Sequence, residues 1–254
     1  MYLVRELLAV AVMVTGFVAA DAPYAGKWKL DPAKSQLTGD TVTIKKLPDG
    51  MLQFDSQGFV YNFRPDGKDY PTPIGGTVSW KGAGPDTWDV TNRLKDKVVS
   101  TVHIVLKGDR QALTIKVMKP DGGTVDSTAS YNRVSGGPGI EGVWRSSEFK
   151  PQATVLQISS DGADSVALKD ESGFAVNGKF DGKDHPASGT LAGASYAFSF
   201  RKVGERAFEM TAKLDGKPYY QDVFTVSADG KTLTDEGTPL NAKAETVKAV
   251  YDRQ

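Results

Sequence analysis

Cysteine is absent from the 254 residues of the chain. Its absence excludes disulfide bonds, thiolate zinc sites, cysteine nucleophiles and a lipid-modified N-terminal cysteine. Histidine is nearly as scarce, since the chain has two, His103 and His185. Two imidazoles are too few for a histidine-rich metal site. We therefore expect neither a metal ion nor any other cofactor.

An excess of charge of one sign is also absent, because 31 Lys and Arg residues balance 31 Asp and Glu residues. Nucleic-acid-binding proteins usually show a basic excess, so we expect no nucleic-acid partner. Long apolar runs are confined to the N-terminus. No later stretch approaches the roughly 20 apolar residues that span a bilayer as a helix, so we expect no integral membrane segment in the mature protein.

The N-terminal residues have the order of features found in signal peptides. Arg5 supplies a positive charge, a mainly apolar run follows at residues 7–18, and the small residues Ala19 and Ala20 end the segment. This order is typical of a secretory signal that is cleaved after its small residues. We predict that residues 1–20 are removed on export, either to the periplasm or to the extracellular space.

The rest of the chain consists of two similar copies. Three motifs recur in the same order, and an ordered series of this kind indicates an internal duplication. The motifs are Gly-x-Trp at 26–28 and 142–144, Asp-Gly-Lys-Asp-(Tyr or His)-Pro at 66–71 and 181–186, and Tyr-x-Arg at 131–133 and 251–253.

A Ser-Gly-Gly-Pro-Gly segment at 135–139 separates the copies, and this composition is typical of a flexible linker. We therefore predict one domain at residues 21–134 and a second at residues 140–254. Because each copy has a complete set of predicted strands, we expect each to fold alone.

Both copies show the pattern of β-strands. Apolar and polar side chains alternate in 41–45, 59–63 and 87–94, for example, with the period of two that half-buried strands have. Asp-Gly pairs, which are typical of hairpin turns, separate many of these runs. We predict an all-β fold with about eight short antiparallel strands in each copy. An antiparallel sheet of this kind leaves no unpaired edge strand when it closes into a barrel, and it protects its edge strands only partly in a sandwich. The alternation of apolar and polar residues is compatible with both architectures.

The motifs at the two ends of each copy resemble the signature of lipocalins and related calycins. In that superfamily a Gly-x-Trp lies on the first strand of an up-and-down β-barrel, and its Trp closes one end. An Arg from the end of the barrel packs across the ring, a contact worth about 0.5–2 kcal/mol. The resemblance implies two tandem small antiparallel barrels. It also implies that Trp28 pairs with Arg133 and Trp144 with Arg253, all four being structural barrel-closing residues.

The first copy also resembles a domain of an uncharacterised family of exported bacterial proteins. The resemblance rests on the Trp-x-Leu-x-x-x-Lys-Ser that begins at Trp28, on the turn at 66–71 and on the Tyr-x-Arg at 131–133. The second copy departs from it at 145–147, which read Arg-Ser-Ser, and at His185. The resemblance implies an exported barrel protein without specifying a ligand.

Neither histidine lies in a recognisable catalytic pattern. His185 occupies a turn position at which the first copy has Tyr70, and His103 aligns with Val223. A position that accepts Tyr or Val in the other copy is typical of packing and not of acid–base chemistry. The sequence also has no Gly-x-Ser-x-Gly elbow, phosphate loop or EF-hand. We therefore predict that the protein is not an enzyme.

Inward-facing side chains are the remaining candidates for a binding site. A pocket that orients a ligand needs a few polar groups among apolar walls. The second copy offers both kinds on one predicted inner face, namely Phe208, Met210, Tyr220, Asp222 and Phe224. We predict that any ligand is small and largely apolar, and that it binds inside the second barrel.

Two alternatives stay open. Tyr220 and Asp222 can instead lie at an open rim, where they are simply solvated. Both barrels can also be packed solid, in which case the protein is a structural or protein-interaction module of the cell envelope. Nothing in the sequence indicates an oligomeric state.

Overall fold

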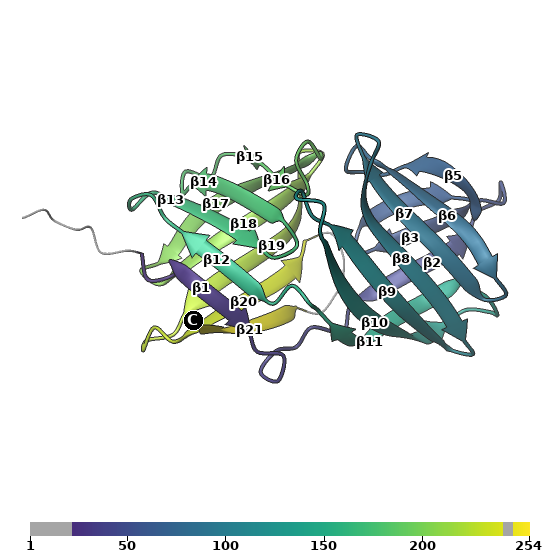
Figure 1. Cartoon of the computed structure of the whole chain (residues 1–254), viewed down its shortest axis with the longest axis horizontal. Coiled ribbons are helices and arrows are strands. Elements are labelled where there is room, and N and C mark those ends of the chain that lie inside the picture. Colours follow the sequence, from purple (N-terminus) through teal and green to yellow (C-terminus); the bar gives the residue numbers. More distant parts are fainter. Residues whose placement is uncertain (1–21, 241–245) are drawn as a thin grey trace, which may run out of the picture.

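The computed structural model describes residues 22–240 and 246–254 (Figure 1). The predicted signal peptide, residues 1–20, lies outside these ranges. Within them the chain forms 21 β-strands and no helix, which confirms the all-β prediction. In this described part of the chain there is accordingly no helix long and apolar enough to cross a membrane.

The first barrel is an antiparallel sheet of ten strands that nearly closes on itself, with β4 against β5 at the seam. In spatial order its strands are β4 (Phe59–Phe63), β3 (Leu52–Ser56), β2 (Thr41–Lys46), β11 (Gly142–Lys150), β10 (Thr124–Ser135), β9 (Arg110–Met118), β8 (Lys97–Lys107), β7 (Thr87–Leu94), β6 (Thr77–Gly84) and β5 (Asp66–Pro71).

The second barrel is an antiparallel sheet of 11 strands, with β14 against β15 and β17 at its seam. In spatial order its strands are β15 (His185–Pro186), β17 (Tyr196–Gly204), β18 (Ala207–Leu214), β19 (Lys217–Val226), β20 (Thr232–Pro239), β21 (Val247–Arg253), β1 (Gly26–Leu30), β12 (Val155–Ser159), β13 (Ser165–Asp170), β14 (Phe174–Lys179) and β16 (Ser188–Gly189).

The predicted tandem of antiparallel barrels is confirmed, whereas about eight strands in each was an underestimate. Two causes account for the difference. β15 and β16 have two residues each, too few to show any alternation. β5 consists of the Asp-Gly-Lys-Asp-Tyr-Pro motif, whose composition predicts a turn.

The two barrels do not coincide with the two sequence repeats. β1 comes from the first repeat, yet it lies in the second barrel between β21 and β12. β11 comes from the second repeat, yet it lies in the first barrel between β10 and β2. Figure 1 shows both, with the purple β1 among the green and yellow strands. This exchange differs from the prediction that 21–134 and 140–254 each form a barrel alone.

The short connection between β10 and β11 gives a physical reason for the exchange. Consecutive strands joined by a short connection usually pair with each other. Arg133 fixes this connection, because its guanidinium donates hydrogen bonds to the carbonyls of Gly139 at 2.8 Å and Glu141 at 2.7 Å. β11 thus occupies the place beside β10 that β1 would take in a self-contained first barrel. β1 pairs with β12 and β21 instead.

Trp28 and Trp144 are the largest completely buried side chains among the described residues. Each indole Nε1 donates a hydrogen bond to the carbonyl four residues earlier, at 3.0 Å to Tyr24 and 2.9 Å to Ile140. These bonds satisfy the polar atom of each ring, so neither ring carries an unpaired buried donor.

An arginine covers each of these rings, but the predicted partners are wrong. The Arg253 guanidinium lies 4.1 Å from the Trp28 ring centroid, and that of Arg133 lies 4.1 Å from the Trp144 centroid. The superfamily resemblance implied Trp28 with Arg133 and Trp144 with Arg253. The pairing is reversed because the strands that carry the two Trp residues are exchanged between the barrels.

Candidate ligand-binding site

The interior of the first barrel contains a pocket of about 380 Å³. Ten of its lining residues come from β3, β4, β6, β7, β8 and β9, and two come from the second barrel. The lining residues are Phe54, Ser56, Phe59, Tyr61, Trp80, Val90, Asn92, Val102, Ile104, Leu113, Tyr196 and Tyr219.

Aromatic rings form one wall of this pocket. Phe54 stacks on Tyr61 with 4.8 Å between ring centroids, and Phe59 meets Tyr61 edge-on at 6.0 Å. Trp80, on the neighbouring β6, approaches Phe54 at 6.4 Å. Such rings supply large rigid apolar surfaces, which suit an apolar or aromatic ligand.

A few polar groups lie among the apolar walls. The Trp80 Nε1 donates a hydrogen bond to the Tyr61 hydroxyl at 3.2 Å. Burial raises the pKa of Tyr61 well above its usual value, so the hydroxyl stays neutral at physiological pH. The Asn92 amide nitrogen donates to the Ser100 hydroxyl at 3.0 Å. Neutral hydroxyl and amide groups can orient a ligand without requiring it to be charged.

The second barrel contributes to the rim of the pocket through Tyr196 and Tyr219. Tyr219 is the extra residue of a β-bulge, because Pro218 pairs with Lys213 and Tyr220 with Ala212. A bulge re-aims one side chain relative to the regular alternation. The Tyr219 hydroxyl accordingly reaches the Ser56 carbonyl of the first barrel, to which it donates at 3.4 Å.

The five residues predicted to bind a ligand come together on two adjacent strands of the second barrel. Phe208 pairs in register with Phe224, Met210 with Asp222, and Tyr220 with Ala212. Phe208 and Phe224 are buried, and their rings stack with 4.8 Å between centroids. These two rings therefore fill the core near Trp28 and leave no gap between them.

Tyr220 and Asp222 are half-buried although they face inward in line with Phe224. Burial raises the pKa of Asp222 to about 7. Burial, together with the nearby carboxylates of Asp222 and Glu236, also raises the pKa of Asp235 well above its ordinary value.

Asp235 is a residue that the sequence reasoning missed. It lies on β20 with the same orientation as the completely buried Leu233, so it faces the barrel interior. Its Oδ1 is out of contact with solvent and has no hydrogen-bond partner among the described residues. The sequence of residues 232–239 could have indicated that Asp235 faces inward, because alternation places it on the same face as Leu233 and Gly237.

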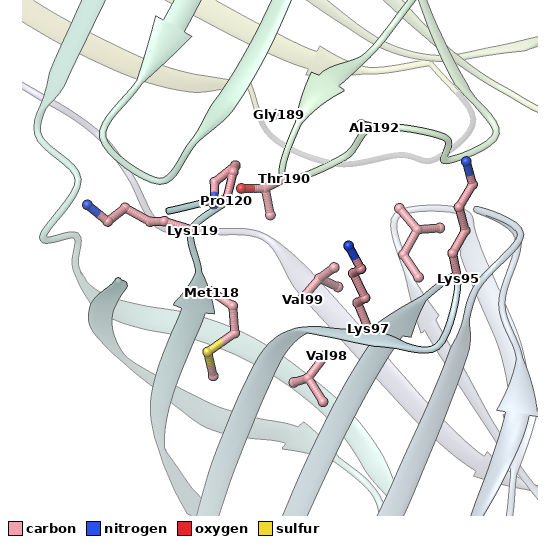
Figure 2. Close-up of a pocket in the computed structure, with 11 residues that line it drawn as sticks. Lys95, Lys97, Val98, Val99, Met118, Lys119, Pro120, Gly189, Thr190 and Ala192 are labelled. Carbon is pink, nitrogen blue, oxygen red and sulfur yellow. The ribbon is translucent and has the colours of Figure 1, made fainter. Parts of the chain in front are cut away.

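A second cavity, of about 420 Å³, lies between the barrels (Figure 2). Lys97 rises from β8 toward the segment of the second barrel that carries Gly189, Thr190 and Ala192. Lys95 and Lys119 also line this groove, with Lys119 held by an ion pair to Asp121 at 3.3 Å. The groove has lysines and no aromatic ring in its lining, so it suits an apolar ligand less well than the barrel pocket.

The two histidines lie in different barrels. His103 is exposed on β8, where its Nδ1 lies 2.7 Å from Asp89. His185 packs beside Gly178 and Phe200, and its Nε2 accepts a hydrogen bond from the Lys179 amide at 3.2 Å. Among the described residues, no group of three or more His, Asp or Glu side chains is arranged to hold a metal ion.

Comparison with known proteins gives no match to a protein-family model and none to a curated protein. The residues of the two barrel interiors are therefore the basis for any functional assignment.

Proposed function

We propose that the protein binds a small, largely apolar molecule in the pocket of the first barrel. The observation that carries the proposal is the aromatic-walled cavity of about 380 Å³, with a few neutral polar groups at its edge. Small-molecule sites typically measure roughly 300–1,000 Å³. The pocket is near the lower end of that range, so the ligand is compact.

One feature of the structure and one of the sequence support a carrier outside the cytoplasm. The Trp–Arg closure of each barrel fits a lipocalin-like interpretation, in which a barrel end is plugged and the interior holds a ligand. The leader-like segment at 1–20 fits export to the periplasm or extracellular space. On this proposal the protein sequesters or transports its ligand in the compartment that it enters.

The first barrel suits an apolar ligand better than the second, contrary to the expectation from the sequence. Val90 and Val102 pair across β7 and β8. The residues that correspond to them in the second repeat, Met210 and Asp222, pair across β18 and β19. The smaller valines leave room in the first barrel, whereas a carboxylate in the second opposes an apolar occupant.

Fluorescence titration with N-phenyl-1-naphthylamine tests this proposal, because the probe is neutral and brightens in apolar surroundings. We expect the parent protein to bind it and Val102→Trp, which fills the pocket, to bind at least about tenfold more weakly, a change of about 1.4 kcal/mol. His103→Trp is the matched control, since it adds the same ring to the next residue on the exposed side of β8.

Thermal unfolding of both variants checks that each remains folded. Equal binding by Val102→Trp and the parent would refute the pocket as the site. Absence of probe binding to the parent would instead favour the alternative of a structural or protein-interaction module.

A further inference from the structure

We propose that the second barrel holds a second site, in which Asp222 and Asp235 bind the ammonium group of a small amine. The two aspartates lie on adjacent antiparallel strands. Asp222 pairs in register with Gly237, and Asp235 precedes that glycine by two residues on the same inner face. They are therefore diagonal neighbours across the lumen-facing side of β19 and β20, an arrangement in which side chains can reach one another.

The absence of a side chain at Gly237 lets two oxygen atoms, the Tyr220 hydroxyl and the Asp222 Oδ1, approach its backbone closely. A Cβ atom at this position would lie 2.9 Å from the Asp222 Oδ1 and would clash with the Tyr220 hydroxyl. The phenol and the carboxylate therefore both lean over the backbone of the glycine. A carboxylate and a hydroxyl directed to one place can accept hydrogen bonds from the same ammonium group, which has up to three to donate.

The Oδ1 of Asp235 has no hydrogen-bond partner among residues 22–240 and 246–254, so the described part of the chain does not complete this cluster. Buried polar atoms are normally hydrogen-bonded, and one without a partner calls for an explanation such as a bound group. Asp222 and Asp235 are half-buried as whole residues, so part of each residue contacts solvent, although the Asp235 Oδ1 is shielded.

The surroundings of the pair are acidic. Burial, followed by the charges of Asp222 and Asp235, raises the pKa of Tyr220. Burial, followed by the charges of Asp235, Asp170 and Asp222, also raises the pKa of Tyr251 on β21. Carboxylates that lie close to one another favour a positively charged occupant.

The first repeat shows that a barrel of this kind does not need the two carboxylates. In the first barrel Val102 takes the place of Asp222, and Leu113, which pairs with Ile104 across β8 and β9 as Asp235 pairs with Phe224, takes the place of Asp235. Both strands form with these apolar residues in place. The acidic pair is thus a feature of the second barrel, and its presence is not explained by the needs of the fold.

Calorimetric titration with hexylamine, hexanol and hexanoate at pH 8 tests the proposal, because these molecules share a chain and differ in the charge of the end group. We expect hexylamine to bind the parent at least about tenfold more tightly than hexanol, and hexanoate to bind most weakly. Asp222→Asn/Asp235→Asn should abolish this preference. Glu205→Gln, an exposed change of the same kind in the turn between β17 and β18, should retain it.

A second variant guards against misfolding of the double Asn protein. Gly237→Ala keeps both carboxylates but places a Cβ where the Tyr220 hydroxyl and the Asp222 Oδ1 now lie, so it should weaken hexylamine binding by a similar factor, while far-ultraviolet circular dichroism checks that the strands still form. Val102→Trp should leave the preference for hexylamine intact, which separates this site from the pocket of the first barrel. Equal binding of hexylamine and hexanol to the parent, or an unaltered preference in both the Asn and Ala variants, would overturn the proposal.

Discussion

The Arg253 guanidinium lies 4.1 Å from the centroid of the Trp28 ring, so the last strand of the second repeat covers the first strand of the first repeat. Its guanidinium also donates hydrogen bonds to the carbonyls of Ala25 at 2.8 Å, Pro23 at 2.6 Å and Gly230 at 2.7 Å. One side chain therefore joins the beginning and the end of the described chain. The closure of the second barrel depends on both repeats.

A double-mutant cycle can test which Trp and Arg residues are partners. Trp28→Ala should cost about 3–5 kcal/mol in unfolding free energy, as a large-to-small change at a buried ring. Arg253→Ala should cost less, and the two losses should be non-additive by about 0.5–2 kcal/mol. Trp28→Ala and Arg133→Ala should instead be additive, because they act in different barrels. Denaturant unfolding measures the free energy of unfolding of each single and double variant. Non-additive losses for Trp28 and Arg133 would instead support an arrangement in which β1 belongs to the first barrel.

The glycine of each Gly-x-Trp motif has a definable role in the same closure. A Cβ at Gly26 would lie 2.6 Å from the Arg253 Nη1, and one at Gly142 would lie 3.0 Å from the Arg133 Nη1. The backbone of Gly26 also has φ +154°, which L side chains rarely adopt. The glycine thus allows the guanidinium to pass over the strand and reach the indole.

Gly26→Ala should therefore destabilise the protein by about 1–3 kcal/mol, by straining the backbone and displacing Arg253 from Trp28. Gly82→Ala is the control, since nothing lies within 4 Å of a Cβ there. It should change stability by less than about 0.5 kcal/mol. Thermal unfolding of the two variants measures the difference. Equal stabilities would mean that the motif glycine has no part in the closure.

The strand exchange makes a prediction about fragments. Every strand of the first barrel lies within residues 41–150, including β11. A fragment of residues 38–151 should therefore fold alone as a monomer. A fragment of residues 21–134 lacks the buried Trp144 and should be at least about 3 kcal/mol less stable, or should associate through its free β1.

Heteronuclear NMR spectra and light scattering distinguish these outcomes for the two fragments. The fragment of residues 38–151 also retains the hydrogen bond that the Ser146 hydroxyl donates to Asp40, which the fragment of residues 21–134 lacks. Asp40 accepts another hydrogen bond from the Tyr131 hydroxyl at 3.0 Å. If residues 21–134 gave a stable monomer equal to residues 38–151, the repeats and not the exchanged barrels would be the folding units.

Much of the fold is predictable from local pattern, whereas the exchange is not. Alternation and Asp-Gly turns predict antiparallel strands because side chains on opposite faces of a sheet meet different surroundings. The two Gly-x-Trp motifs are interchangeable, however, so nothing in them specifies which Arg covers which Trp. That choice depends on the connection at 136–141, which Arg133 orders and whose Gly-rich composition predicts a flexible linker.

The site was predictable in part for a similar reason. The alternation in β18 and β19 places Phe208, Met210 and Asp222 on one inner face, as expected. The pocket of the first barrel could not be predicted, because it depends on how Trp80 and Tyr61 pack and on Tyr219 arriving from the other barrel. The proximity of Asp235 to Asp222 depends on the register between β19 and β20, which local alternation does not specify.

The Asp222–Asp235 pair also makes stability depend on pH. Both groups have a folded-state pKa above the value of about 3.9 for an unfolded aspartate, and that of Asp222 is about 7. The folded protein therefore holds more protons than the unfolded chain between about pH 4 and pH 7. The stabilisation from the protonated groups is complete below about pH 4, and the part that comes from Asp222 is lost as the pH rises through about 7.

Other carboxylates titrate at lower pH, so the comparison with a variant isolates the effect of the pair. Asp229, for example, has a lowered pKa because it accepts hydrogen bonds from Ser227 and from the backbone of Lys231, and its contribution changes in the opposite direction. Asp222→Asn/Asp235→Asn removes the pair and leaves these groups in place. Relative to the parent, the variant should gain stability steadily from pH 4 to pH 8 in denaturant titrations. Parallel pH profiles for the two proteins would show that the pair is ionised in the folded state and is not held in the buried, protonated arrangement argued above.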